Sequence, residues 1–325
     1  MDVRTDLWLL LLGFALALVL GLILIPLLKR LKAGQSILQY VEQHAAKSGT
    51  PTMGGLIFIF PIIGMAAVLL GVDTPLCLIM VLGSFGYGLV GFLDDFLKIK
   101  TKQNLGLRPY QKIIGQLGIA LLVAFFYMRL NPSGQIFVPF FNVYWRLGGV
   151  GIFILTLFVL IATTNAVNLT DGLDGLAGTT GLVYLFFIYI LIMLYDFGDE
   201  MATMGNILAV AIGSLMAYLL FNTKKASVFM GDTGSLFLGG LIAMVSLFSG
   251  LGLIIVFLGV VFVWSALSTI MQVLFFKVTK GKRIFRMAPF HHHLEKGGMQ
   301  EPKIVMLYTV ITILIGVILV LSISY

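Results

Sequence analysis

Long hydrophobic runs separated by short polar stretches recur along this chain of 325 residues. A helix of about 20 apolar residues can cross the hydrocarbon core of a bilayer, which is about 30 Å thick. The pattern predicts ten such spans, at about 7–28, 54–72, 76–93, 113–130, 150–168, 175–195, 201–221, 235–250, 252–276 and 304–324. We therefore expect an all-α polytopic membrane protein with one integral membrane domain, residues 1–325.

Two connections between these spans carry their own signals. Residues 235–276 contain no charged side chain, and as one helix they would extend about 63 Å, about twice the hydrocarbon thickness. We therefore place a tight turn at 249–252, where the sequence reads SGLG. Between the fourth and fifth spans, Pro132, Gly134, Pro139 and several aromatic residues favour a short hairpin within 131–149.

Composition and charge then orient the chain. It is 59% hydrophobic and only 11% charged, whereas an ordinary globular domain is about 25% charged. The single cysteine excludes an internal disulfide and argues against a cysteine-rich metal site. Of the 21 Lys and Arg, all but Arg4, Arg129 and Arg146 fall on segments that alternate to one side of the membrane. Because basic residues are retained on the cytoplasmic side, we expect both termini outside and this basic face in the cytosol.

Five aspartates lie on the same predicted cytosolic face. Asp94 and Asp95 follow the third span, Asp171 and Asp174 follow the fifth, and Asp232 precedes the eighth. Aspartate near a helix end can serve only as a cap or turn residue, and for the last three, taken singly, that alternative stays open. Two adjacent acids beside an apolar helix exceed what a cap requires, since a carboxylate near hydrocarbon is costly.

Basic and amide side chains share these segments. Lysines, asparagines, Gly-rich turns and the run His291–His293 accompany the aspartates. A single lysine could serve topology alone, and three histidines could simply lie in a solvated loop. Together, however, carboxylates suit Mg²⁺, which prefers oxygen ligands shared with substrate phosphates. Lysines and helix N-termini suit phosphate oxygens. The set therefore favours phosphoryl transfer at the cytosolic face.

Five motifs in this order resemble a known family. The sequence is similar to the phospho-N-acetylmuramoyl-pentapeptide-transferases, and the wider superfamily of polyprenyl-phosphate sugar-phosphate transferases shares the Asp-Asp and Asn-Asp pieces. The uninterrupted HHH after APF resembles the muramoyl-pentapeptide branch. The matching pieces are TPTMGG (50–55), GFLDDFLK (91–98), TNAVNLTDGLDGLAG (164–178), FNTKKASVFMGDTGSLFLGG (221–240) and APFHHHLEKGG (288–298).

The resemblance implies a reaction and its partners. Phospho-N-acetylmuramoyl-pentapeptide would pass from UDP-N-acetylmuramoyl-pentapeptide to undecaprenyl phosphate, giving UMP and the first lipid-linked peptidoglycan precursor, lipid I. The family requires Mg²⁺, acts at the cytosolic face of the bacterial cytoplasmic membrane and forms homodimers. Nucleic acid is not an expected partner.

The resemblance also assigns roles residue by residue. Asp232 would be the metal ligand, and Asp94 and Asp95 the catalytic pair, with Asp94 as a base toward the lipid phosphate. Phe229 would stack on uracil. The residues expected to contact substrate are Lys47, Thr52, Lys98, Lys102, Lys112, Asn168, Asp171, Asp174, Asn222, Phe229, Gln272, His291, His292 and His293.

Three other functions remain as alternatives. A sister transferase would move another UDP-linked N-acetylhexosamine phosphate onto the same lipid. A cation-coupled transporter would carry ionisable residues near mid-span, whereas nearly all those found here lie at span ends. An aspartyl intramembrane protease would need two aspartates that face each other within the bilayer.

Overall fold

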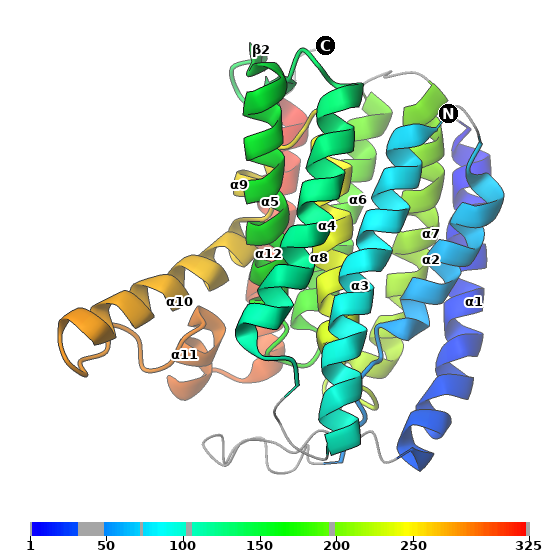
Figure 1. Ribbon diagram of the computed structural model, residues 1–325. Coiled ribbons are helices and arrows are strands. Elements are labelled where there is room, and N and C mark those ends of the chain that lie inside the picture. The colour runs from blue at the N-terminus through cyan, green and yellow to red at the C-terminus, as the bar shows by residue number, and fades with distance from the viewer. Residues whose placement is uncertain (1, 32–48, 72–73, 102–105, 195–198, 323–325) are drawn as a thin grey trace.

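The protein is a bundle of long helices with one small hairpin (Figure 1). The computed structural model describes residues 2–31, 49–71, 74–101, 106–194 and 199–322. Within these residues, nine helices are long and apolar enough to cross a membrane. They are α1 (Val3–Arg30), α3 (Pro75–Thr101), α4 (Pro109–Leu130), α5 (Gly148–Thr170), α6 (Leu176–Leu194), α7 (Asp199–Asn222), α8 (Gly231–Phe248), α10 (Val260–Val278) and α12 (Glu301–Ser322). The predicted all-α polytopic membrane architecture is confirmed.

The second predicted span is shorter than expected. Helix α2 (Leu56–Leu69) has 14 residues, which is about 21 Å of helix. It starts late because the preceding segment is paired elsewhere: Gly54 N–H donates to the Phe229 carbonyl, and Phe229 N–H donates to the Pro51 carbonyl, both at 2.8 Å. The TPTMGG motif is thereby joined to the segment that leads into α8.

The turn predicted at 249–252 is confirmed, but the span after it is not one helix. Helix α8 ends at Phe248, and Gly250 adopts a φ of 73°. The predicted helix 252–276 is divided at Gly259 into α9 (Ile254–Leu258) and α10. Gly259 leaves helical geometry, so α10 takes a new direction and runs away from the bundle (Figure 1).

The expected hairpin within 131–149 is present at one end of the bundle. Strand β1 (Gln135–Val138) pairs antiparallel with β2 (Val143–Arg146), with Gln135 opposite Arg146. The start of α1 and the end of α12 lie at this same end (Figure 1), where Asn142 Nδ2 donates to the Ser322 carbonyl at 3.3 Å. The described chain therefore begins and ends on one side, as predicted. That this side is outside stays a prediction.

Helix α8 occupies the centre of the bundle. Every residue from Thr233 to Phe248 is buried, and α3 and α5 pack along it. The α3 crossing is close, because a side chain at Gly91 would collide with the Asp232 carbonyl. The first turn of α8 is therefore held against α3, at the end of the bundle opposite the hairpin (Figure 1).

Candidate active site

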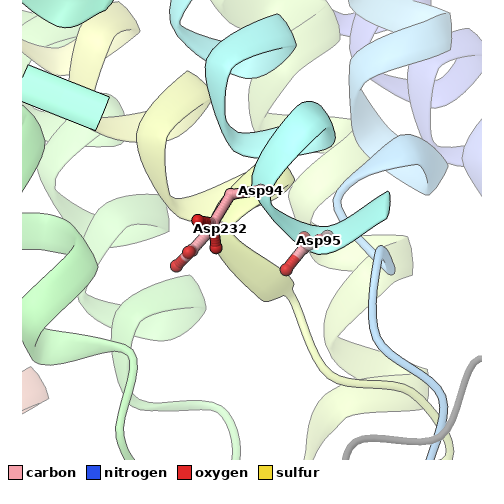
Figure 2. A group of neighbouring side chains, drawn as sticks. All are labelled: Asp94, Asp95 and Asp232. Atoms are coloured by element: carbon pink, nitrogen blue, oxygen red, sulfur yellow. The ribbon is translucent and has the colours of Figure 1, made fainter. Parts of the chain in front are cut away.

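Three aspartates converge where α3 meets the start of α8 (Figure 2). Asp94 and Asp95 come from α3 and Asp232 from the first turn of α8. One carboxylate oxygen from each lies within 4.8 Å of the others. The sequence predicted a membrane span that ends at about residue 93, and the helix that contains it, α3, continues beyond it to Thr101.

The extension of α3 has a local cause. Lys98 follows Asp94 by one helical turn, and its Nζ lies 2.5 Å from Asp94 Oδ2. An acid placed N-terminal to a base at this spacing stabilises a helix. The two adjacent acids therefore sit on a helix and not on a loop, with exposed fractions of only 3% for Asp94 and 1% for Asp95.

Each aspartate of the α3 pair is fixed by donors from another segment. Asp95 Oδ2 accepts from the Thr233 backbone N–H at 2.9 Å and from Thr233 Oγ1 at 2.7 Å. Asp94 Oδ1 accepts from the Leu107 N–H at 2.8 Å. These bonds satisfy one oxygen of each carboxylate and hold both carboxylates in place.

Asp232 is held by three side chains from three other helices. Its Oδ2 accepts from Lys98 Nζ at 2.9 Å and from Lys112 Nζ at 3.0 Å. Its Oδ1 accepts from Asn168 Nδ2 at 2.6 Å. The N-cap of α8 is Met230, and no side chain caps this helix. Capping, the simpler alternative for Asp232, was therefore wrong.

The donor set of this centre fits a hard divalent cation. Its three carboxylates face two ammonium groups, those of Lys98 and Lys112, so one negative charge is in excess. All the candidate ligand atoms are oxygens, and Mg²⁺ takes oxygen ligands. The cluster of Asp94, Asp95 and Asp232 can thus hold a metal ion.

The loop after α5 lies next to this centre and has different electrostatics. Asp171 is the C-cap residue of α5, a position where the helix dipole disfavours a negative charge. Burial, followed by the negative charges of Asp232, Asp95 and Asp174, raises the pKa of Asp171 to about 8. We therefore expect Asp171 to be protonated at neutral pH when no cation is bound. A favourable interaction between its charge and the dipole of α5 does not explain why an aspartate stands at this position.

Asp174 and Asn222 join this loop to the segment before α8. Asp174 Oδ2 accepts from the Ala226 N–H at 3.3 Å. Asn222 Oδ1 accepts from the Gly175 N–H at 3.1 Å, and its Nδ2 donates to the Val228 carbonyl at 2.9 Å. In the described structure both side chains join the loop after α5 to the segment before α8.

The three histidines lie on the short helix α11 (Phe290–Lys296) in three different environments. His291 is fully buried, and neither ring nitrogen has a hydrogen-bond partner in the described part of the chain. Burial, then the charge of His292, lowers the pKa of His291 to about 3. His292 Nδ1 lies 2.9 Å from Glu295 Oε2. His293 Nδ1 accepts from the Arg286 N–H at 3.0 Å.

Other predicted site residues have distinct placements. Thr52 Oγ1 is buried, without a hydrogen-bond partner among the described residues, and lies near Gly231 at the start of α8. Phe229 is half-buried beside it. Gln272 Oε1 accepts from the backbone of Ile284 and Phe285 at 3.2 and 2.9 Å, so its carbonyl oxygen anchors the loop before α11. Lys47 and Lys102 fall outside the described residues.

The structure adds site residues that sequence reasoning missed. Thr233 binds Asp95, and Ser235 Oγ lies 2.8 Å from Asn168 Nδ2. The motif MGDTGS carried a signal for both, because hydroxyl groups in the first turn of a helix often have polar partners. A cavity of about 660 Å³ lies between the loop after α5, the segment before α8 and the end of α11. Its charged lining residues include Asp174, Lys224, Lys225, Glu295 and Glu301.

Comparisons with known proteins agree with this geometry. The family described as Glycosyl transferase family 4 matches residues 77–250, which include all three aspartates of the centre. The phospho-N-acetylmuramoyl-pentapeptide-transferase signature 1 matches residues 47–59.

Full-length relatives decide the family. The phospho-N-acetylmuramoyl-pentapeptide-transferase of Heliobacterium modesticaldum is 42% identical, over 98% of this chain and 98% of its own length. Those of Desulfitobacterium hafniense and Bacillus subtilis are each 41% identical, over 96% and 94% of this chain and 95% and 94% of their own lengths. The chain belongs to the phospho-N-acetylmuramoyl-pentapeptide-transferase family. The resemblance in its five motifs is thus confirmed, and the family is one of transferases.

Proposed function

We propose that this chain transfers phospho-N-acetylmuramoyl-pentapeptide from UDP-N-acetylmuramoyl-pentapeptide to undecaprenyl phosphate. The products are lipid I and UMP, and the reaction takes place at the cytosolic face of the bacterial cytoplasmic membrane. One observation carries the proposal: Asp94, Asp95 and Asp232 form a compact cluster with Lys98 and Lys112 in a chain of this family. Two anionic reactants can meet only where positive charge and fixed donors offset their repulsion.

Mg²⁺ is the proposed cofactor. Asp232 would hold it, with Asp94 and Asp95 close enough to share it, since one oxygen of each lies within 4.8 Å of the others. When bound, the ion supplies positive charge to phosphoryl oxygens and to the leaving UMP.

The lysines and Asn168 have roles of their own. Lys98 and Lys112 contact Asp232 from different helices. Their ammonium groups would also donate hydrogen bonds to substrate phosphates. Asn168 fixes the other oxygen of Asp232. These contacts determine the direction of the carboxylate before substrate arrives, which is the pre-organisation that phosphoryl transfer requires.

Asp94 is the proposed partner of the lipid phosphate. A phosphate monoester has a second pKa of about 6 and is mostly ionised at pH 7. Asp94 therefore has little proton to remove, and orienting the phosphate through a hydrogen bond serves the attack equally well. With Oδ1 bonded to the Leu107 N–H and Oδ2 near Lys98, the carboxylate is held for this purpose.

The remaining predicted contacts complete the proposal. Thr52, Asn168, Asp171, Asp174, Asn222, Phe229 and the histidines of α11 would bind the nucleotide sugar, with Phe229 against uracil. Lys47, Lys102 and Gln272 would also contact substrate, and the chain would act as a homodimer.

The test is a product assay on the purified protein with Mg²⁺. Both UDP-N-acetylmuramoyl-pentapeptide and UDP-N-acetylglucosamine are supplied, with and without undecaprenyl phosphate. We expect UMP release only with the lipid acceptor, and a lipid product that carries the muramoyl pentapeptide. A lipid-linked N-acetylglucosamine would instead identify the sister transferase, and UMP release without lipid would contradict transfer to the polyprenyl phosphate.

A further inference from the structure

A pair of amide side chains joins α4 to α5 close to the site. Asn165 Nδ2 donates to Gln116 Oε1 at 2.7 Å. Gln116 is fully buried, and its backbone carbonyl also accepts from Tyr87 Oη at 3.3 Å. Gln116 therefore contacts both α3 and α5, the two helices against which α4 packs.

Helical spacing connects this pair to the aspartate cluster. Gln116 follows Lys112 by four residues on α4. Asn165 precedes Asn168 by three residues on α5, and residues at these spacings are neighbours on one face of a helix. Lys112 Nζ lies 3.5 Å from Asn168 Oδ1, and both side chains contact Asp232, at 3.0 and 2.6 Å. Two successive polar contacts thus join α4 to α5, and the one formed by Lys112 and Asn168 includes Asp232.

The pair of Gln116 and Asn165 contributes more to the geometry of the bundle than to its stability. Gln116 Nε2 is buried without a hydrogen-bond partner among the described residues, which is unfavourable, and hydrogen bonds between membrane helices stabilise a bundle only weakly. A hydrogen bond does, however, require a defined distance and angle, whereas apolar contact is non-directional. Because Asn165 Nδ2 is also held by the Ile161 carbonyl at 2.8 Å, its bond to Gln116 fixes α4 against α5.

We propose that Gln116 and Asn165 are positioning residues, which hold Lys112 and Asn168 where both contact Asp232. Neither amide of the pair touches a reacting atom. The inference rests on the proposed function, because the pair acts through Lys112, the proposed donor to substrate phosphate. We expect loss of the pair to lower the rate of transfer by about 10–100-fold, since a misplacement of about 1 Å at a reacting centre can cost about 100-fold.

The first test compares two buried hydrogen bonds. Gln116→Met keeps an unbranched side chain of similar length and exchanges the unpartnered Gln116 Nε2 for a single unpartnered N–H on Asn165. Its melting temperature should therefore stay close to wild type, while lipid product formation falls by about 10–100-fold. Tyr184→Phe is the matched control, because it removes a buried bond of 2.7 Å between Tyr184 Oη and Ser246 Oγ, which joins α6 to α8. Its rate should stay near wild type, and equal losses of rate in the two variants would overturn the proposal.

Two double variants separate positioning from packing. Gln116→Met with Asn165→Leu removes both amides, so its stability should equal or exceed that of Gln116→Met alone. We expect its rate to stay low, because apolar contact does not fix the two helices in direction, and recovery of the wild-type rate would overturn the proposal. In a Lys112→Gln background, Gln116→Met should cost little more. Independent, multiplicative losses would show that Gln116 does not act through Lys112.

A further measurement does not depend on activity. ¹⁵N NMR of the lysine side chains in the metal-free protein in detergent reports the surroundings of the Lys112 ammonium group, and Lys112→Gln assigns its signal. We expect this signal to move in Gln116→Met and to stay in place in Tyr184→Phe. An unmoved signal in Gln116→Met would overturn the proposal. A displaced signal together with an inactive wild-type protein would refute the proposed function and leave the positioning of Lys112 intact.

Discussion

Asp94, Asp95 and Asp232 form one group of acids at one end of the bundle. Asp171, on the loop after α5, is near them but has different surroundings. The carboxylates of Asp94, Asp95 and Asp232 all accept hydrogen bonds or ion pairs from ammonium, amide or hydroxyl donors. Asp171 faces other carboxylates, and its pKa is raised to about 8. The first group has the oxygen ligands to hold a cation, while we expect Asp171 to retain its proton at neutral pH without the metal.

The difference shows that position on a membrane face does not determine the chemistry of an acid. Lys98 and Lys112 lie within 3.0 Å of Asp232, and these lysines distinguish the two groups. A protonated Asp171 can donate a hydrogen bond, which an ionised carboxylate cannot. The same type of side chain can therefore offer a cation its ligands in one group and act as a neutral donor in the other.

The largest expected effect comes from Asp232→Asn. The change removes the proposed metal ligand and leaves Lys98 and Lys112 without their shared acceptor. We expect lipid product formation to fall by about a thousandfold or more, as when a group at a reacting centre is lost. Size-exclusion chromatography in detergent should show a folded protein. Near-normal product formation would show that Asp232 is not the metal ligand.

Gly91→Ala should disturb the same centre by disrupting the packing of α3 against α8. A methyl group there collides with the Asp232 backbone, which pushes α8 away from α3 and separates the aspartates. We expect a loss of stability of about 1–3 kcal/mol, typical of overpacking, and a large loss of activity.

Gly118→Ala on α4 is the matched control, because no atom lies within 4 Å of the added methyl group. Melting curves and product assays on both variants make the comparison. If the two glycine changes behave alike, the close crossing of α3 and α8 is not what positions the acids.

A smaller effect is expected for Lys112→Gln. It removes one of the two cations that bind Asp232 and one proposed donor to substrate phosphate, and we expect activity to fall by about 10–100-fold. Lys100→Gln, near the exposed end of α3, should leave activity close to wild type. Steady-state rates at saturating Mg²⁺ measure both, and equal losses would mean that overall charge matters more than the contact with Asp232.

The smallest expected effect is the pH dependence of stability that Asp171 causes. Because the pKa of Asp171 is raised to about 8 from about 3.9 in the unfolded chain, folded Asp171 binds a proton that the unfolded chain loses. Its contribution to stability therefore falls as pH rises from about 4 to about 8.

Asp171→Asn cannot ionise, so its melting temperature relative to wild type should be higher at pH 9 than at pH 6. Each pH unit from 6 to about 8 adds about 1.4 kcal/mol to this difference, and each kcal/mol corresponds to about 2–4 °C. The measurement belongs in metal-free buffer, since a bound cation would favour the ionised acid. A constant difference between the variants across this pH range would mean that Asp171 titrates normally.

Much of the membrane architecture followed from the sequence alone. Hydrophobic runs of the length of a bilayer located nearly every helix, and the turn at 249–252 followed from length, since no single helix could be that long. Pro132, Gly134 and Pro139 indicated the hairpin, and the motif residues indicated the acids of the site. These features depend on local composition, which a sequence displays directly.

Tertiary structure alone decided which helix faces protein and which acids share a site. Helices α8 and α10 have similar hydropathy, 1.4 and 1.7, yet 89% of the first and 22% of the second is buried within the protein. Hydropathy measures removal from water, and lipid and protein interior provide this equally. Likewise, Lys112 and Asp232 are 120 positions apart, and only the packing of four helices brings them within hydrogen-bonding distance.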